Sequence, residues 1–285
     1  MLSLQKQFSD YWKIGIGLQK VDNLNCSNYL IAIANQQIQG KLAIDDALKQ
    51  IYLHYQDNCK DNYQKEADIV ASRIVKLLSE ENFTFEIKEL LSIHKALFEG
   101  ILACNEAGAF REFNIAKKEP ILNGDTVIYG RADGILDYLE YDFKRESEFN
   151  YQGVTNDEVI DHIASFISNV WQCHPFTEGN TRTIAIFTIK YLKKLGFVPN
   201  STPFYQSSKY FRDALVRANY QNFPKEIYHS EEYLNHFLAN CYLGEDYLLD
   251  NIQLKICLKE EQSSSFKNYS FLMIQSRYFR SIKSL

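Results

Sequence analysis

Two apolar helical segments on either side of a short polar loop, within residues 159–195, constrain the fold more than any other part of the chain. Apolar residues recur every three or four positions from 159 to 171, which is typical of one face of a buried helix. A second apolar segment occupies residues 184–195. Pro175 cannot continue the first helix, and Gly179 permits a tight turn before the second. The sequence therefore predicts two buried helices joined by a loop.

The loop carries groups that suit a phosphate and a metal ion. The second helix is expected to begin near Thr181, and its free N–H groups and positive dipole end attract anions. Arg182 adds a planar guanidinium that fits phosphate oxygens. Glu178 repels phosphate unless it holds a divalent metal that the phosphates share. His174 suits a general base for an attacking hydroxyl. The loop predicts phosphoryl or nucleotidyl transfer to a hydroxyl; a buried histidine followed by an ordinary turn is the alternative.

Residues 174–185 also resemble the signature of Fic-domain proteins, H-x-F-x-[DE]-G-N-[GK]-R-x-x-R. The matching residues are His174, Phe176, Glu178, Gly179, Asn180 and Arg182. The resemblance implies that His174 is the general base and that Glu178 holds Mg²⁺. It also implies that the nucleotide phosphates bind to Gly179, Asn180, Thr181 and Arg182. Two positions depart from the signature, since Thr181 replaces a Gly and Ala185 replaces the second Arg, which in the family binds the distal phosphate.

The sequence pattern of residues 119–130 predicts a small β-hairpin. Asn123 and Gly124 form a strong two-residue turn signal between apolar residues. In Fic domains this hairpin is a flap over the active site, and its edge pairs with an extended segment of the target protein. The residues assigned to this docking edge are Ile121, Leu122, Val127 and Ile128. A connecting hairpin without a partner is the alternative.

Residues 1–60 have a helical pattern that is broken near Gly40, and they predict an N-terminal helical arm. The segment from Asn35 to Gly40 resembles a degenerate inhibitory motif of Fic proteins, [ST]-x-x-x-E-[GN], in which Gln39 replaces the Glu. In the intact motif that Glu pairs with the second signature Arg, and here both are absent because position 185 is Ala. An ordinary helix end at Gly40 is the alternative.

Two further aromatic or imidazole side chains have alternative interpretations. Tyr210 begins a Tyr-x-x-x-Ala-Leu pattern that resembles the family segment packing on the adenine base, and a core aromatic fits equally. His94 lies on the apolar face of residues 86–98 and is expected to be a packed core histidine. Residues 93–115 resemble the segment that precedes the flap in Fic domains.

The composition favours a globular protein without nucleic-acid or membrane partners. The chain has 285 residues, 46% of them hydrophobic, and a formal charge of −5, so it can build a core and has no bulk attraction to polyanions. The six cysteines form no C-x-x-C pair, which argues against a zinc site or a disulfide framework. The N-terminus is amphipathic and no segment is long and apolar enough to span a bilayer, so we expect a cytoplasmic protein. Delivery into another cell stays open.

These observations predict a mainly α fold, a Fic-type helical bundle with a small β-hairpin flap. The expected parts are an N-terminal arm (1–60), a Fic-like core (61–245) and a C-terminal helical extension with a basic tail (246–285). The expected function is transfer of AMP from ATP to a Ser, Thr or Tyr hydroxyl of a target protein, with Mg²⁺ as cofactor. The alternatives are an inert scaffold that binds a nucleotide or a protein, and a transferase with a different donor. A homo-oligomer stays open.

Overall fold

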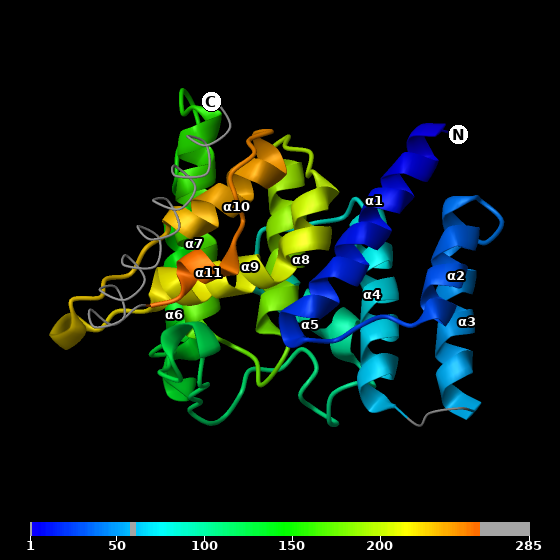
Figure 1. Cartoon of the computed structure of the whole chain (residues 1–285), viewed down its shortest axis with the longest axis horizontal. Helices are drawn as coiled ribbons and strands as arrows, with labels where there is room; N and C mark the ends of the chain where they lie inside the picture. Colours follow the sequence, from blue (N-terminus) through cyan, green and yellow to red (C-terminus); the bar gives the residue numbers. More distant parts are fainter. Residues whose placement is uncertain (1, 58–60, 257–285) are drawn as a thin grey trace, which may run out of the picture.

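A computed structural model describes residues 2–57 and 61–256, and helices dominate them (Figure 1). The α-helices of this part are α1 (Leu2–Leu18), α2 (Asn28–Ile38), α3 (Ile44–Asp57), α4 (Asn62–Ser79), α5 (Ile87–Phe98), α6 (Ile135–Ser147), α7 (Asn156–Cys173), α8 (Asn180–Lys194), α9 (Ser201–Asn219), α10 (Glu232–Tyr242) and α11 (Asn251–Leu254). The 3-10 helices are η1 (Gln19–Asp22), η2 (Pro120–Leu122), η3 (Ala132–Gly134) and η4 (Phe223–Lys225). The mainly α prediction is confirmed. The basic tail predicted for residues 263–285 lies outside the described residues.

The predicted pair of buried helices, α7 and α8, forms the centre of the fold (Figure 1). A capping box made by Thr155 and Glu158 starts α7. All residues of α8 from Asn180 to Leu192 are buried, so this helix is surrounded by other parts of the fold. Helices α4, α5 and α7 pack around α8. The loop between α7 and α8 is therefore anchored at both ends in the core.

Helix α1, the first part of the predicted arm, packs between α4 and α9. Two glycines permit this close approach: an added Cβ would lie 2.6 Å from the Ala71 carbonyl oxygen at Gly15, and 2.2 Å from the Phe204 carbonyl oxygen at Gly17. Helices α2 and α3 lie at the side of the molecule, against α1 and α4 (Figure 1). None of the helices among the described residues has the length and apolarity needed to cross a membrane.

The prediction of a β-hairpin at 119–130 was wrong. The Asn123-Gly124 turn exists, and the Glu119 N–H donates to the Asp125 carbonyl at 2.9 Å, but no ladder extends beyond it. The β-bridge found within the described ranges is isolated and lies elsewhere in the chain, between residues 222 and 227. The carbonyl of Ile121 accepts instead from the Ile256 N–H at 3.0 Å. The turn is therefore hydrogen-bonded to the C-terminal segment rather than to a second strand.

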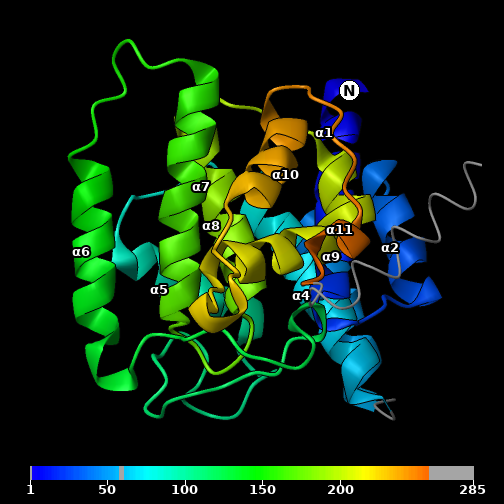
Figure 2. The same cartoon turned by 60° about the vertical axis from the view of Figure 1, so that its left-hand side comes forward.

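The long segment between α5 and α6 runs along the end of the molecule where α7 stops (Figure 2). It includes residues 99–134 and contains the turn at which a hairpin was predicted, as well as the short helices η2 and η3. Arg111 in this segment donates to the carbonyls of Cys173 and His174, at 3.2 and 2.8 Å. The segment therefore covers the loop that joins α7 to α8.

Candidate active site

His174 is buried directly after the last residue of α7. Its backbone is left-handed, with a φ of 49°, and its side chain is 4% exposed. The ring Nδ1 lies 3.2 Å from the Trp171 carbonyl oxygen, which places the proton on Nδ1 and leaves Nε2 as the basic nitrogen. Burial, and secondarily the charge of Lys117, lower the pKa of His174 well below its usual 6.5. The imidazole is therefore neutral, as a general base requires.

The backbone around His174 is held by the buried guanidinium of Arg111. Besides the carbonyls of Cys173 and His174, it donates to the carbonyls of Phe113, at 2.6 Å, and Gly130. The last carbonyls of a helix lack partners within that helix, so Arg111 satisfies groups that would otherwise be orphaned. Arg111 lies in the segment that resembles the region before the flap, but no sequence pattern indicated this role for it.

His94 is the packed core histidine that the sequence predicts, and it also supports the loop. Its ring stacks on Phe176 with centroids 3.7 Å apart. Its Nδ1 accepts from the Gly108 N–H at 2.8 Å, so Nε2 carries the proton and donates to the Glu178 carbonyl at 3.1 Å. Burial lowers the pKa of His94 to about 4. Neutral His94 therefore joins the loop to α5.

The loop closes on itself before α8. The side chain of Asn180 accepts from the Phe176 N–H at 2.9 Å and donates to the Phe176 carbonyl at 2.7 Å. Gly179 has a φ of 76°, and an added Cβ would lie 2.3 Å from the Phe98 ring. The hydroxyl of Thr181 accepts from the Trp171 indole at 3.0 Å. Asn180 and Thr181 therefore use their side chains to shape the loop, and only their backbone N–H groups are free for an anion.

The three N–H groups that open α8, those of residues 180, 181 and 182, have no acceptor within the described residues. They mark the positive end of a helix that is 15 residues long. This arrangement is suited to an anion, and the anion site at the start of the second helix stays a prediction.

Arg182 is committed to other side chains in this structure. It is 2% exposed, and its Nη2 donates to Glu66 at 2.6 Å while its Nη1 donates to Gln19 at 3.0 Å. Its Nε lies 2.9 Å from Asp22 Oδ2, and its guanidinium lies over the Phe98 ring at 4.8 Å. We call Gln19, Asp22 and Glu66 the Arg182 clamp. No sequence motif marks these three residues, because they come from η1 and α4, far from residue 182 in the chain.

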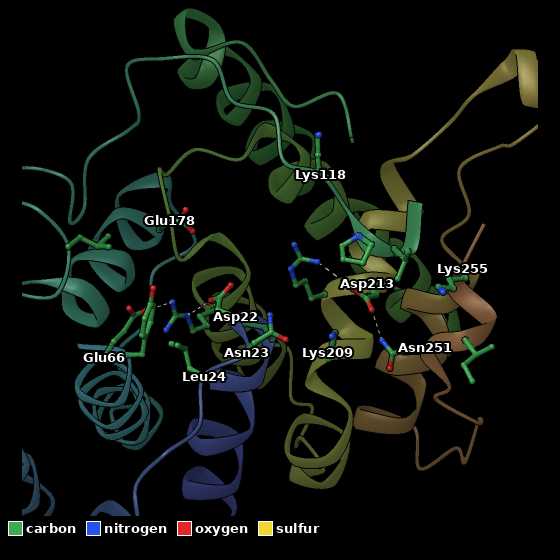
Figure 3. A pocket seen from close by; sticks show the side chains of 18 residues that line it. Asp22, Asn23, Leu24, Glu66, Lys118, Glu178, Lys209, Asp213, Asn251 and Lys255 are labelled. Atoms are coloured by element: carbon green, nitrogen blue, oxygen red, sulfur yellow. Dashed lines mark hydrogen bonds and ion pairs between the residues drawn. The ribbon is translucent and has the colours of Figure 1, made fainter. Parts of the chain in front are cut away.

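Two cavities meet at the loop. A small one of about 20 Å³ contains His174 and the start of α8, and it has room for about one water molecule. A large one of about 990 Å³, drawn in Figure 3, shares the lining residues Asp22, Glu178 and Arg212 with the small one. Glu178 is half exposed, and its Oε2 lies 3.2 Å from Lys117 Nζ across the small cavity. The structure is therefore a conformation in which His174 is closed off from a large substrate.

Glu178 is the carboxylate of the loop that could hold a metal ion. Among residues 2–57 and 61–256 no group of three His, Cys, Asp or Glu side chains is arranged to hold a metal. Asp22 is the other carboxylate that lines the small cavity, and this carboxylate is already paired with Arg182. Mg²⁺ commonly binds through one or two carboxylates and the substrate phosphates. Glu178 fits this mode.

The structure separates several predicted site residues from the two cavities. Tyr210 is fully buried and packs parallel to Phe237, with ring centroids 6.5 Å apart, so it is the core aromatic of the two alternatives. Ala185 is 0% exposed in the middle of α8 and borders neither cavity. Position 185, where the family signature has its second Arg, therefore lies inside the core of this protein.

The predicted inhibitory motif does not reach the loop. Asn35 and Gln39 are exposed at the end of α2, and neither lines the small or the large cavity. Helix α2 ends at Ile38, and Gly40 has a φ of 73°, as in an ordinary helix end. The N-terminal contact with the signature is made by η1 instead, through Gln19 and Asp22.

The predicted docking edge is mostly buried. Ile121, Leu122 and Val127 are between 1% and 7% exposed, because their side chains pack into the core. Ile128 is 78% exposed. Three of the four residues predicted for docking therefore have buried side chains, and Ile128 is the member of the predicted set that faces solvent.

The site thus combines a buried histidine, the free N–H groups at the start of a helix and a helical body. Residues 84–192 match the model of the Fic/DOC family, so this segment of the chain has the sequence features of a Fic/DOC domain. The BepC protein of Bartonella tribocorum, a VirB-translocated effector with bound AMPPNP, has a similar structure: 18% identity, a TM-score of 0.50, and coverage of 65% of this chain and 89% of that one. The type IV secretion system effector BepA has 22% identity and a TM-score of 0.51, with 65% and 62% covered. At these identities the likeness shows the fold. No curated protein matches the chain.

The low pKa of His94 predicts acid sensitivity of the fold. Its folded pKa of about 4 lies below its usual 6.5, so the unfolded chain binds the proton first as the pH falls. His94 should therefore cost no stability above pH 6.5 and about 3 kcal/mol by pH 4, at about 1.4 kcal/mol per pH unit. NMR titration of the ring protons and urea unfolding at pH 7.5 and 4.5 measure the two quantities. A His94 resonance that titrates near 6.5 would contradict the prediction.

Proposed function

We propose that this chain transfers a phosphate-containing group, with AMP from ATP as the leading case, to a hydroxyl of a target protein. The observation that supports it best is the neutral, buried His174 beside the free N–H groups at the start of α8. A base and an anion site within one small cavity are the two parts that such a reaction needs. The bound AMPPNP of the BepC structure supports a nucleotide as the donor.

In the proposed reaction the hydroxyl oxygen of the target bonds to the α-phosphorus, and the bond from that phosphorus to the bridging oxygen breaks. His174 takes the hydroxyl proton at Nε2, and pyrophosphate leaves. The N–H groups of residues 180–182 stabilise the charge that develops on the phosphoryl oxygens. Mg²⁺ held by Glu178 would neutralise charge on the leaving phosphates. Positioning supplies most of the remaining rate.

The proposal requires a change at the Arg182 clamp. While Asp22 and Glu66 occupy the guanidinium, Arg182 is not free to bind phosphate oxygens. Asp22 also lines both cavities, together with Glu178 and Arg212. We therefore propose that a shift of η1 joins the cavities and releases Arg182, which would give the N-terminal helices a regulatory role.

An inert scaffold remains the second candidate function. The buried Ala185, the occupied Arg182 and the small volume around His174 all favour it. A transferase that uses a donor other than ATP is a variant of the first proposal, since the signature loop itself does not recognise the nucleobase.

Labelling of a cell lysate separates these functions. The pure protein and Mg²⁺ are supplied with ATP that carries label on the α or the γ phosphate. AMP transfer predicts label on protein only from the α position, and phosphate transfer only from the γ position. Absence of label from ATP, followed by label from another nucleotide, identifies a different donor. Absence from every donor, with nucleotide binding intact, supports the scaffold and contradicts the transferase.

Target docking is expected to depend on Ile128. This exposed side chain borders a cavity of about 460 Å³ that also includes Tyr129, which lines the His174 cavity. Ile128→Asp should lower transfer to the protein target about tenfold or more and leave nucleotide affinity unchanged, because it charges an apolar contact. Val198→Asp is the matched control, since Val198 is 81% exposed and lines a separate cavity. Equal loss in both variants, or in neither, would contradict docking at Ile128.

A further inference from the structure

The large cavity beside the loop has walls of opposite charge. Asp22, Glu66 and Glu178 lie on one side of it, and Lys118, Lys209 and Lys255 lie on the other (Figure 3). These three lysines, which we call the lysine cluster, come from the segment before η2, from α9 and from the residue after α11. They are distant in the chain, so only the fold brings them to one cavity.

The two walls differ in how their charges are compensated. Asp22 and Glu66 are paired with Arg182, and Glu178 is paired with Lys117. In the described part of the chain, by contrast, none of the three lysines has a carboxylate within ion-pair distance. The cavity therefore has an acidic side whose three carboxylates share two cations, and a basic side that keeps free positive charge.

The other charged groups on the basic side leave this surplus in place. Arg212 is paired with the buried Glu119 at 2.8 Å, so this pair adds no net charge. The carboxylate of Asp213 accepts from the Asn251 amide at 2.6 Å, and burial raises the pKa of Asp213. Asp213 also lies 3.4 Å from Arg212, so the cavity lining on this side carries three ammonium groups without a carboxylate partner of their own.

We infer that the lysine cluster binds the distal phosphates of a nucleoside triphosphate and replaces the cation missing at position 185. A cavity of about 990 Å³ is large enough for a nucleotide. Ammonium groups bind phosphate as flexible point charges and tolerate the varied directions of these side chains. The apolar lining, which includes Leu24, Leu102 and Ile252, suits a nucleobase or sugar face.

The inference rests on the proposed function in one respect only, namely that the bound triphosphate is the donor substrate of the transfer. The cavity shares Glu178 and Arg182 with the signature loop, so a triphosphate anchored on the lysine cluster lies next to the anion site of α8. Position 185 is closed in the core, and the lysines supply the positive charge from a different wall. A polyphosphate is therefore the ligand class for this wall, whether or not transfer follows.

Calorimetry with the full chain tests the inference. The variant replaces Lys118, Lys209 and Lys255 by Gln, and the probes are ATP, inorganic triphosphate and adenosine. We expect the affinity for ATP and for triphosphate to fall about tenfold or more, and the affinity for adenosine to stay unchanged. The loss should shrink at high salt, because salt screens exposed charges. The corresponding triple Arg variant should retain binding.

The matched control replaces Lys41, Lys49 and Lys88 by Gln, which removes the same charge from exposed positions outside the cavity. Equal affinities in the two triple variants, or absence of triphosphate binding to the unchanged chain, would overturn the inference. Circular dichroism and thermal melting establish that both variants fold. Triphosphate binding that is lost only in the cavity variant, in a protein without transfer activity, would support the inference and reject the proposed transfer.

Discussion

Replacement of His174 by alanine is expected to lower the transfer rate by about 10²–10⁴-fold, which is the usual contribution of a general base. The imidazole is neutral and lies in the small cavity with the N–H groups of α8, so its loss removes the proton acceptor and leaves the anion site in place. Nucleotide affinity should therefore stay within a few-fold. The result would separate catalysis from binding at this loop.

The measurement combines single-turnover labelling with calorimetry of nucleotide binding. His229→Ala is the control, because His229 is exposed and lines neither the small nor the large cavity. Arg111 holds the backbone at position 174 independently of the ring, so the loop should keep its shape in the His174 variant. Unchanged labelling in His174→Ala would remove this residue from the mechanism.

Replacement of Asp22 by Asn is expected to raise the transfer rate, by about tenfold if the Arg182 clamp limits activity. The change keeps the size of the side chain but removes one of the two carboxylates on the guanidinium. A charge-assisted contact contributes about 1.5–3 kcal/mol, so a phosphate that takes the place of Asp22 gains on that order. Glu66 still pairs with Arg182, which avoids leaving a buried charge alone.

Ligand-dependent melting tests the clamp separately from the rate. Asp22→Asn should lower the melting temperature of the free protein, because it weakens an ion pair of a buried guanidinium. The rise in melting temperature on addition of ATP should be larger than in the unchanged chain, since the phosphates supply the missing partner. Asp46→Asn, at an exposed position on α3, is the control. Lower stability without a larger ATP effect would mean that the clamp only supports the fold.

A double-mutant cycle with Arg182 gives the coupling directly. If Asp22 acts on the site through Arg182, the effects of Asp22→Asn and Arg182→Gln on nucleotide affinity should not add. Additive effects would show that Asp22 blocks the passage between the two cavities and does not control the guanidinium. The two explanations predict different affinities for the same four proteins.

The local architecture of the site could be predicted from neighbouring residues alone. The end of α7 at His174 follows from Pro175, and the tight turn follows from Gly179, whose φ of 76° a residue with a Cβ rarely adopts. The apolar spacing on both sides of the loop identified two core helices. These features depend on residues within one or two helical turns, so a single sequence contains the information.

The interpretations that failed depend on what packs against each segment. The turn at Asn123 and Gly124 formed, yet Ile121 and Leu122 packed into the core and hydrogen bonds to Ile256 replaced a second strand. The Tyr210 pattern fitted a base-stacking and a core role equally, and burial against the neighbouring helix decided between them. Apolar side chains fit a strand edge and a core surface alike, so tertiary packing makes the choice.

The state of Arg182 was decided entirely by the tertiary structure. The sequence placed a guanidinium at the start of α8 and so predicted a phosphate contact, but its partners Gln19 and Glu66 are 163 and 116 residues away in the chain. They reach it because α1 packs between α4 and α9, with Gly15 and Gly17 permitting the close approach. Local spacing determines which groups a helix end presents. The long-range packing of other helices determines whether those groups are free.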